Sequence, residues 1–143
     1  MSEGGAVSKA GSLDGIWRLV SALSWGPDGT PLPPPYGSAP LGTVQIQNGR
    51  MLAVLCDGDQ VLSDGRAREY VSYGGPCSFD GGLLTTRVDL SARADWLDGV
   101  QARDALLDGD RLVLRPPLRE YGGILQQREL VWERVWTPAS ERS

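Results

Sequence analysis

The chain has 143 residues, a length typical of one domain, and its 14 Lys and Arg against 18 Asp and Glu give a formal net charge of −4. The charges are scattered, and no basic stripe is interleaved with aromatic residues, which argues against nucleic acid and membrane surfaces as partners. Histidine is absent, so the commonest general base and transition-metal ligand is missing, and we expect neither a metal nor a cofactor.

The two ends of the chain are polar. Residues 1–11 are rich in Gly, Ser and Ala and lack the charged start and apolar core of a signal peptide, so we predict disordered tails at 1–11 and 138–143 around a domain at 12–137. No apolar run approaches the ~18–20 residues of a transmembrane helix. We expect Cys56 and Cys77 to be free thiols in a cytoplasmic protein, with a disulfide between adjacent strands as the alternative.

The first half of the chain alternates between strand and turn signals. Residues 13–25 are predicted as a strand with one face formed by Trp17, Leu19, Ser21, Leu23 and Trp25. The proline-rich segment 31–40 cannot form a helix or a central strand, so we expect a long loop that serves as a lid or as a stiff connector. Asn48-Gly49 is a strong hairpin signal and predicts that strands at 41–47 and 51–56 pair.

The second half continues this pattern. Residues 61–70 are compatible with a short helix, and strands are predicted at 73–79, 83–91, 100–107, 111–115 and 124–136. Asp108-Gly109-Asp110 marks a second hairpin between two of them. The sequence thus predicts an all-β fold of about eight short strands with at most one short helix, as a barrel or a sandwich.

Two short motifs lie near the ends of this series. Gly15-Ile16-Trp17-Arg18 opens the first predicted strand, and Leu130-Val131-Trp132-Glu133-Arg134 lies in the last. The pair resembles the signature of the calycin superfamily, in which the first and last strands are neighbours and an Arg packs over the Trp. The resemblance implies a closed barrel in which Trp17 and Arg134 are structural residues.

The likeness extends along residues 13–135 and is similar to the bacterial lipocalin-like domain family. It is carried by Gly42-x-Val44, Asn48-Gly49-Arg50-Met51, Tyr73-x-Gly75, Trp96 before Gly99 and Gln101-x-Arg103, and Gly109-Asp110-Arg111-Leu112. This chain has Thr86-Arg87 where the family often has a histidine, and Cys77 where it usually has an aromatic residue. The resemblance implies a single antiparallel up-and-down barrel, lipocalin-like, with a pocket for a small molecule.

Three residues are candidates for catalysis. Gln101 and Arg103 share one face of a predicted strand, and if that face lines the interior they project into an apolar space. A buried guanidinium suits a carboxylate, an enolate or a polarised carbonyl, because its donors form a planar fork. The alternatives are an internal salt bridge or an Arg103 that faces water. Tyr73 can donate a hydrogen bond to a ligand carbonyl, and the alternative is that it only forms part of the pocket wall.

Further residues are candidates for ligand contact. The loop-end aromatics can form a rim, Thr86 can supply a pocket hydroxyl, and two residues share a strand face with Tyr73; the set is Trp25, Tyr36, Phe79, Thr86, Trp96, Cys77 and Glu129. Ordinary packing is the alternative for the aromatics and, in the absence of an activating base, for Cys77. Whether Glu129 can contact a ligand depends on which face of the last strand points inward, and the sequence pattern leaves both faces open.

These features predict a protein that binds a small apolar or aromatic molecule inside a barrel. We interpret it as an enzyme of the cofactor-independent cyclase, isomerase or lyase type in secondary metabolism, which works by positioning and carbonyl polarisation. The alternative is a non-catalytic binding or carrier protein, and a third, more distant one is an interaction domain. A homodimer is compatible with the sequence.

Overall fold

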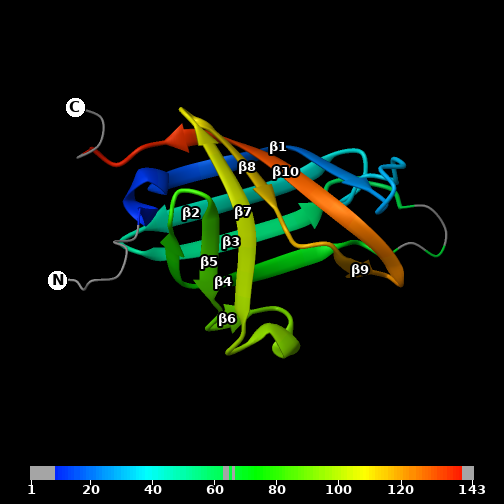
Figure 1. Cartoon of the computed structure of the whole chain (residues 1–143). Coiled ribbons are helices and arrows are strands. Elements are labelled where there is room, and N and C mark those ends of the chain that lie inside the picture. The colour runs from blue at the N-terminus through cyan, green and yellow to red at the C-terminus, as the bar shows by residue number, and fades with distance from the viewer. Residues whose placement is uncertain (1–8, 63–64, 66, 140–143) are drawn as a thin grey trace.

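The computed structural model describes residues 9–62, 65 and 67–139, and strands dominate it (Figure 1). The elements in chain order are the 3₁₀ helix η1 (Ala10–Leu13), β1 (Gly15–Trp25), β2 (Pro40–Gln47), β3 (Arg50–Asp57), β4 (Tyr70–Phe79), β5 (Leu83–Arg87), β6 (Leu90–Ser91), the 3₁₀ helix η2 (Ala94–Trp96), β7 (Val100–Asp108), β8 (Arg111–Arg115), β9 (Arg119–Tyr121) and β10 (Ile124–Trp136). No helix in the described part of the chain is long and apolar enough to cross a membrane.

The strands close into one antiparallel barrel. Its eight strands follow the order β1-β2-β3-β4-β5-β7-β8-β10, and β10 pairs in turn with β1. The short strands β6 and β9 pair with β4 and β10 outside this circuit. Closure removes the free edges of the sheet and encloses an interior. The predicted all-β, lipocalin-like barrel is thereby confirmed.

The two predicted hairpins are present. Asn48 and Gly49 both have positive φ, +55° and +71°, between the paired residues Gln47 and Arg50. This is the geometry that a two-residue hairpin turn requires, and Asn-Gly adopts it readily. β7 and β8 pair up to Asp108 and Arg111, so they are joined by a turn of the same length.

The face of β1 differs from the one that simple alternation predicts. A β-bulge shifts the register against β10 between Leu19 and Ser21. One extra residue reverses which side chains point inward. Beyond the bulge, Ala22 and Ser24 are therefore buried, whereas Leu23 is 50% exposed. The predicted shared face of Trp17, Leu23 and Trp25 is wrong for this reason.

Three other segments depart from expectation. The described residues of 61–69 form no helix, and β4 already begins at Tyr70, while 63–64 and 66 lie outside the described residues. The single strand expected at 83–91 is divided into β5 and β6. In the segment expected as an N-terminal tail, Ala10 is buried in η1, whereas 1–8 and 140–143 lie outside the described residues.

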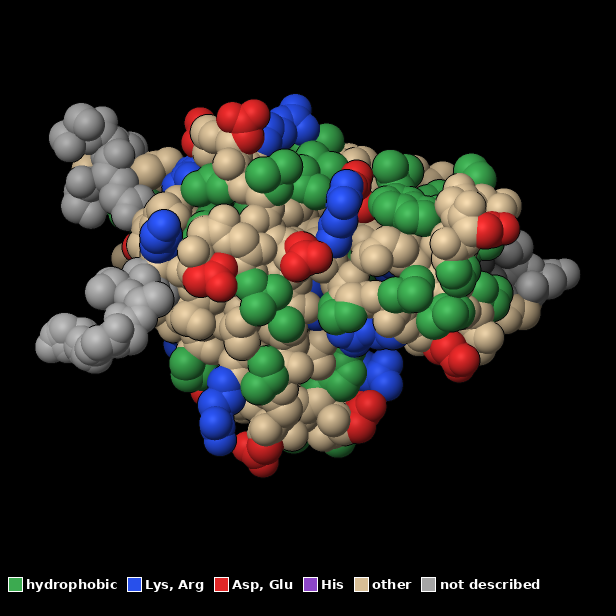
Figure 2. Space-filling view, in the orientation of Figure 1, with side chains coloured by type: hydrophobic (Ala, Val, Ile, Leu, Met, Phe, Trp, Pro, Cys, Tyr) green, Lys and Arg blue, Asp and Glu red, His purple; other side chains and the backbone are tan. Residues whose placement is uncertain are grey.

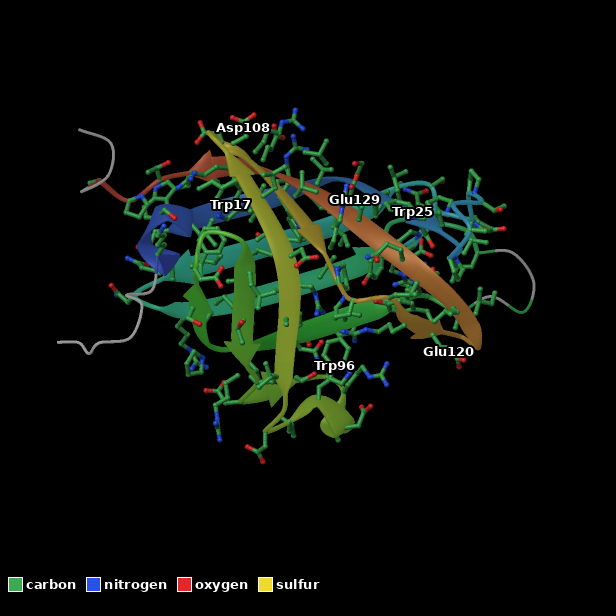
Figure 3. All side chains as sticks on the ribbon, in the orientation of Figure 1. Trp17, Trp25, Trp96, Asp108, Glu120 and Glu129 are labelled. Atoms are coloured by element: carbon green, nitrogen blue, oxygen red, sulfur yellow. The ribbon has the colours of Figure 1, made fainter. Side chains whose placement is uncertain are left out.

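One end of the barrel is closed by η1 and a stacked pair of side chains. The Trp17 indole donates a hydrogen bond to the Leu13 carbonyl at 2.8 Å, and the Arg134 guanidinium lies 4.4 Å from the centroid of the Trp17 ring. Arg134 also donates to the carbonyls of Asp14 (2.7 Å) and Ser12 (3.1 Å). This arrangement fixes η1 across the barrel end, away from Trp96 (Figure 3).

Candidate functional site

The barrel interior holds a cavity of about 270 Å³. Its wall is formed by Tyr36, Val44, Met51, Ala53, Leu55, Glu69, Tyr70, Val71, Tyr73, Arg93, Trp96, Arg103, Leu114, Pro116, Arg119, Tyr121, Arg128, Leu130 and Trp132. An apolar cavity of ~150 Å³ takes up benzene, so the volume suits a molecule of one or two rings.

The floor of the cavity is apolar because alternate residues of neighbouring strands point inward. β3 contributes Met51, Ala53 and Leu55, while β8 and β10 contribute Leu114 and Leu130, and all five are buried. These side chains bind the apolar body of a ligand but supply no orientation. Orientation has to come from the polar groups on the wall.

The first polar group on the wall consists of residues from the strands β4 and β7 and from the 3₁₀ helix η2. The Arg103 guanidinium lies 5.6 Å from the centroid of the Tyr73 ring, and Trp96 packs edge-on against Tyr73 at 5.5 Å between ring centroids. Arg103 donates a hydrogen bond to the Ala102 carbonyl at 2.9 Å. A cation on an aromatic face is held in place by the quadrupole of the ring, so Tyr73 and Trp96 orient Arg103 inside the barrel.

The second polar group joins the proline-rich loop to β10. The Arg128 guanidinium lies 3.7 Å from the centroid of Tyr121 and 5.7 Å from that of Tyr36. Glu69 accepts hydrogen bonds from the Tyr36 backbone N–H (2.9 Å) and from Arg128 (3.4 Å). Burial raises the pKa of Tyr36 to about 12, so its phenol stays protonated at neutral pH. Through its two hydrogen bonds, Glu69 links the proline-rich loop to β10.

The electrostatics of the wall are dominated by arginine. Burial lowers the pKa of Arg119, although a guanidinium remains charged in proteins.

Outside the wall, burial raises the pKa of Cys77 to about 11, which keeps it as a thiol at neutral pH. Among the described residues, no group of three or more His, Cys, Asp or Glu side chains is placed to hold a metal ion.

The structure separates the predicted site residues into two groups. Four of them, Tyr36, Tyr73, Trp96 and Arg103, line the cavity together although they come from distant parts of the sequence. Gln101, Thr86 and Phe79 are buried in the barrel but are not part of the cavity wall. Thr86 donates its hydroxyl to the Met51 sulfur at 2.8 Å, and the Gln101 amide oxygen meets no donor from the described residues.

The remaining three candidates are also outside the cavity wall. Cys77 is half-buried against the hydrophobic core. Trp25, at the end of β1, forms a β-bridge with Pro31. Glu129 points outward from β10, where it pairs with Arg115 at 2.6 Å (Figure 3). The inward face of β10 is the one that carries Leu130 and Trp132, which places Glu129 on the other side of the sheet.

Sequence reasoning missed Arg119, Tyr121 and Arg128. Arg128 shares its strand face with Leu130 and Trp132, so the choice of that face as the interior would have pointed to it. Arg119 and Tyr121 lie in β9, a three-residue strand next to a Pro-Pro pair. Nothing in the local pattern indicates that β9 folds back against the cavity.

A closed antiparallel barrel with an internal, mostly apolar cavity defines a small-molecule-binding barrel protein, and the architecture supports that general function. The family model of the lipocalin-like domain matches residues 14–135. The chain therefore belongs to the lipocalin-like domain family, as its motifs indicate. Comparison with curated proteins and with solved structures finds no match.

Proposed function

We propose that the protein takes up a single small aromatic molecule in the barrel cavity and orients it by its carbonyl or carboxyl group. The observation that carries this proposal is the cavity of about 270 Å³, in which an apolar floor faces Arg103 and Tyr73. The floor supplies most of the binding free energy, since each Å² of buried apolar surface contributes roughly 25 cal/mol. The two polar side chains fix one end of the ligand.

A neutral aromatic ketone, 2-acetonaphthone, tests this proposal. Trp96 and Trp132 line the cavity, so binding inside the barrel is expected to change their fluorescence saturably, with one site per chain. Ala53→Leu reduces the free volume of the cavity and is expected to weaken binding by about tenfold or more. Ala102→Leu on the outer face of β7 is the matched control and leaves binding unchanged. Unsaturable quenching, or equal binding by both variants, contradicts the proposal.

We also propose a second function, cofactor-free catalysis on the bound ligand. It is supported by Arg103, which lies over the Tyr73 ring and donates a hydrogen bond to the Ala102 backbone carbonyl. Donors aimed at a ligand carbonyl stabilise the negative charge that develops when a neighbouring C–H loses its proton. Such an enolate can reprotonate or attack within the same molecule, which yields isomerisation or cyclisation without a cofactor.

Hydrogen–deuterium exchange at the methyl group of bound 2-acetonaphthone tests this chemistry. The proton leaves to solvent, the electron pair moves to the carbonyl oxygen, and a deuteron returns from D₂O. The wild-type protein is expected to accelerate exchange, and Arg103→Ala and Tyr73→Phe are each expected to slow it by roughly a hundredfold. Exchange at the wild-type rate in both variants removes the catalytic assignment and leaves binding as the function.

We propose a cytoplasmic location. It is supported by Cys56 and Cys77, which are both free thiols rather than partners in a disulfide. Free thiols persist in reducing compartments. Fractionation of cells that produce the tagged full chain is expected to recover it in the cytoplasmic fraction, and recovery from the medium or the envelope contradicts the proposal.

A further inference from the structure

The cavity wall has more positive charge than its carboxylates can neutralise. Four arginines, Arg93, Arg103, Arg119 and Arg128, face a single acid among the described wall residues, Glu69. This excess occurs inside a chain whose formal net charge is −4. Arg103 and Arg128 are each only 8% exposed, and buried charge is costly in free energy unless an opposite charge or a ligand compensates it.

Two of the four arginines have a carboxylate partner. Arg128 pairs with Glu69 at 3.4 Å, and Arg93 pairs with Asp95 at 2.9 Å. Arg103 and Arg119 have none within the part of the chain that the structure describes, and Arg103 donates a hydrogen bond to the Ala102 backbone carbonyl. We call Arg103 and Arg119 the unpaired arginines, because neither has a carboxylate partner among the described residues.

The unpaired arginines also act on each other. Arg103 is only 8% exposed, and after burial and an opposing contribution from Tyr121, the charge of Arg103 adds to the lowering of the Arg119 pKa. Two like charges repel, and because Arg103 is buried and Arg119 partly buried, water screens this repulsion less than it would at the surface. An anion between them relieves the repulsion and supplies acceptors to both guanidinium groups.

A further donor on the wall lacks an acceptor. Trp132 is 1% exposed, and its indole N–H has no hydrogen-bond partner among the described residues. A buried donor without a partner is destabilising. The barrel interior beside the cavity therefore holds one uncompensated donor in addition to the unpaired arginines.

We infer that the ligand is a small aromatic carboxylate, whose carboxylate group is bound by Arg103 and Arg119 and whose ring lies on the apolar floor. The inference rests on the proposed function, because it requires a small molecule in the barrel, and it adds the charge of that molecule. The cavity of about 270 Å³ limits the ring system to one or two rings. Arg119, which sequence patterns did not reveal, becomes a specificity-determining residue.

Calorimetric titration with matched acids and amides tests the inference. The probes are benzoate against benzamide and 2-naphthoate against 2-naphthamide, which differ in charge but hardly in shape. The full-length wild-type protein is expected to bind each acid about tenfold tighter than its amide. Arg103→Met and Arg119→Met keep the length of the side chain without its charge. Each is expected to bring the affinity for the acid down to that for the amide, whose own affinity changes by no more than about threefold.

Arg87→Met is the matched control. Arg87 is exposed at the end of β5, and its side chain forms no ion pair within the described residues. Its replacement removes one positive charge from the outer surface, so the acid preference is expected to stay at the wild-type value. A loss of preference equal to that of Arg103→Met shows a general charge effect and overturns the inference.

The remaining outcomes distinguish this inference from the proposed function. Equal or tighter binding of the amides overturns the inference, while the small-molecule function stands. Failure of all four probes to bind overturns the inference, and failure of 2-acetonaphthone as well overturns the proposed function. Circular dichroism verifies that each variant is folded, and if Arg103→Met does not fold, Arg119→Met decides the result.

Discussion

Arg134 connects three parts of the closed barrel end through one side chain. Its guanidinium stacks on Trp17 at 4.4 Å and donates to the carbonyls of Ser12 and Asp14, so β10, β1 and η1 are held together. None of these residues lines the cavity. The stack therefore stabilises the barrel without a contact to the proposed ligand.

Arg134→Ala is expected to lower the free energy of unfolding by about 2–4 kcal/mol, because charge-assisted hydrogen bonds and the cation–π contact are lost together. Urea denaturation measures this change. Arg18→Ala removes only an exposed ion pair with Glu133 and is expected to cost less than about 1 kcal/mol. An unchanged midpoint in Arg134→Ala contradicts the structural assignment of this residue.

Cys77 illustrates how burial alone sets reactivity. Desolvation raises its pKa to about 11, and the nearby charge of Asp14 adds to the effect. The thiolate, which is the nucleophile, is thus scarce at pH 8. This argues for packing as the role of Cys77.

In a Cys56→Ser background, we expect iodoacetamide to alkylate Cys77 more slowly in the folded protein at pH 8 than in the urea-unfolded protein. The native state holds the thiol proton more tightly than the unfolded state. Stability is therefore expected to fall as the pH rises from the ordinary thiol range, about 8.5, towards the folded pKa of about 11. Equal alkylation rates in the two states contradict the assignment.

At the scale of elements, a glycine permits the close contact between β4 and the end of β5. Gly75 has a φ of +153°, and a Cβ at this position would lie 1.9 Å from the Arg87 carbonyl oxygen. Only glycine tolerates both this backbone angle and the close approach of the Arg87 carbonyl oxygen. The motif Tyr73-x-Gly75 thus combines a cavity residue with the close contact between β4 and the end of β5.

Gly75→Ala is expected to destabilise the protein by about 2–4 kcal/mol, because the backbone of β4 or of the segment at Arg87 has to move. Chemical denaturation checks the size of the effect. Gly11→Ala is the matched control, since its added Cβ meets nothing within 4 Å and its φ lies outside the positive range. Similar midpoints for Gly75→Ala and the wild type would refute the steric argument.

At the scale of the whole molecule, the barrel is packed at one end and hollow at the other. Trp17, Leu13 and the side chains around η1 fill the first part, whereas the cavity occupies the part bounded by β9, η2 and the proline-rich loop (Figures 1 and 3). On the outer face, Figure 2 shows hydrophobic and charged side chains interspersed. The interior cavity, with its apolar floor, is the part of the molecule that suits an apolar ligand.

Two substitutions by the same residue distinguish the packed part from the hollow part. Ala22→Leu inserts volume at a buried position outside the cavity wall and is expected to destabilise the protein by about 1–3 kcal/mol through overpacking. Ala53→Leu projects into the cavity and is expected to change stability by less than about 1 kcal/mol. Thermal unfolding of both variants checks this difference, and an equal loss would contradict a hollow interior.

The sequence by itself determined the eight barrel strands approximately, the hairpin at Asn48-Gly49 and the family, because alternation, turn residues and ordered motifs are local properties of the chain. It also indicated Tyr73 and Arg103, since each shares an apolar strand face. Only the tertiary structure decided that Arg119 and Arg128 join them and that Glu129 points outward. A bulge, the choice of the inward face of β10 and the return of β9 depend on how distant strands pair, and no local pattern encodes that pairing.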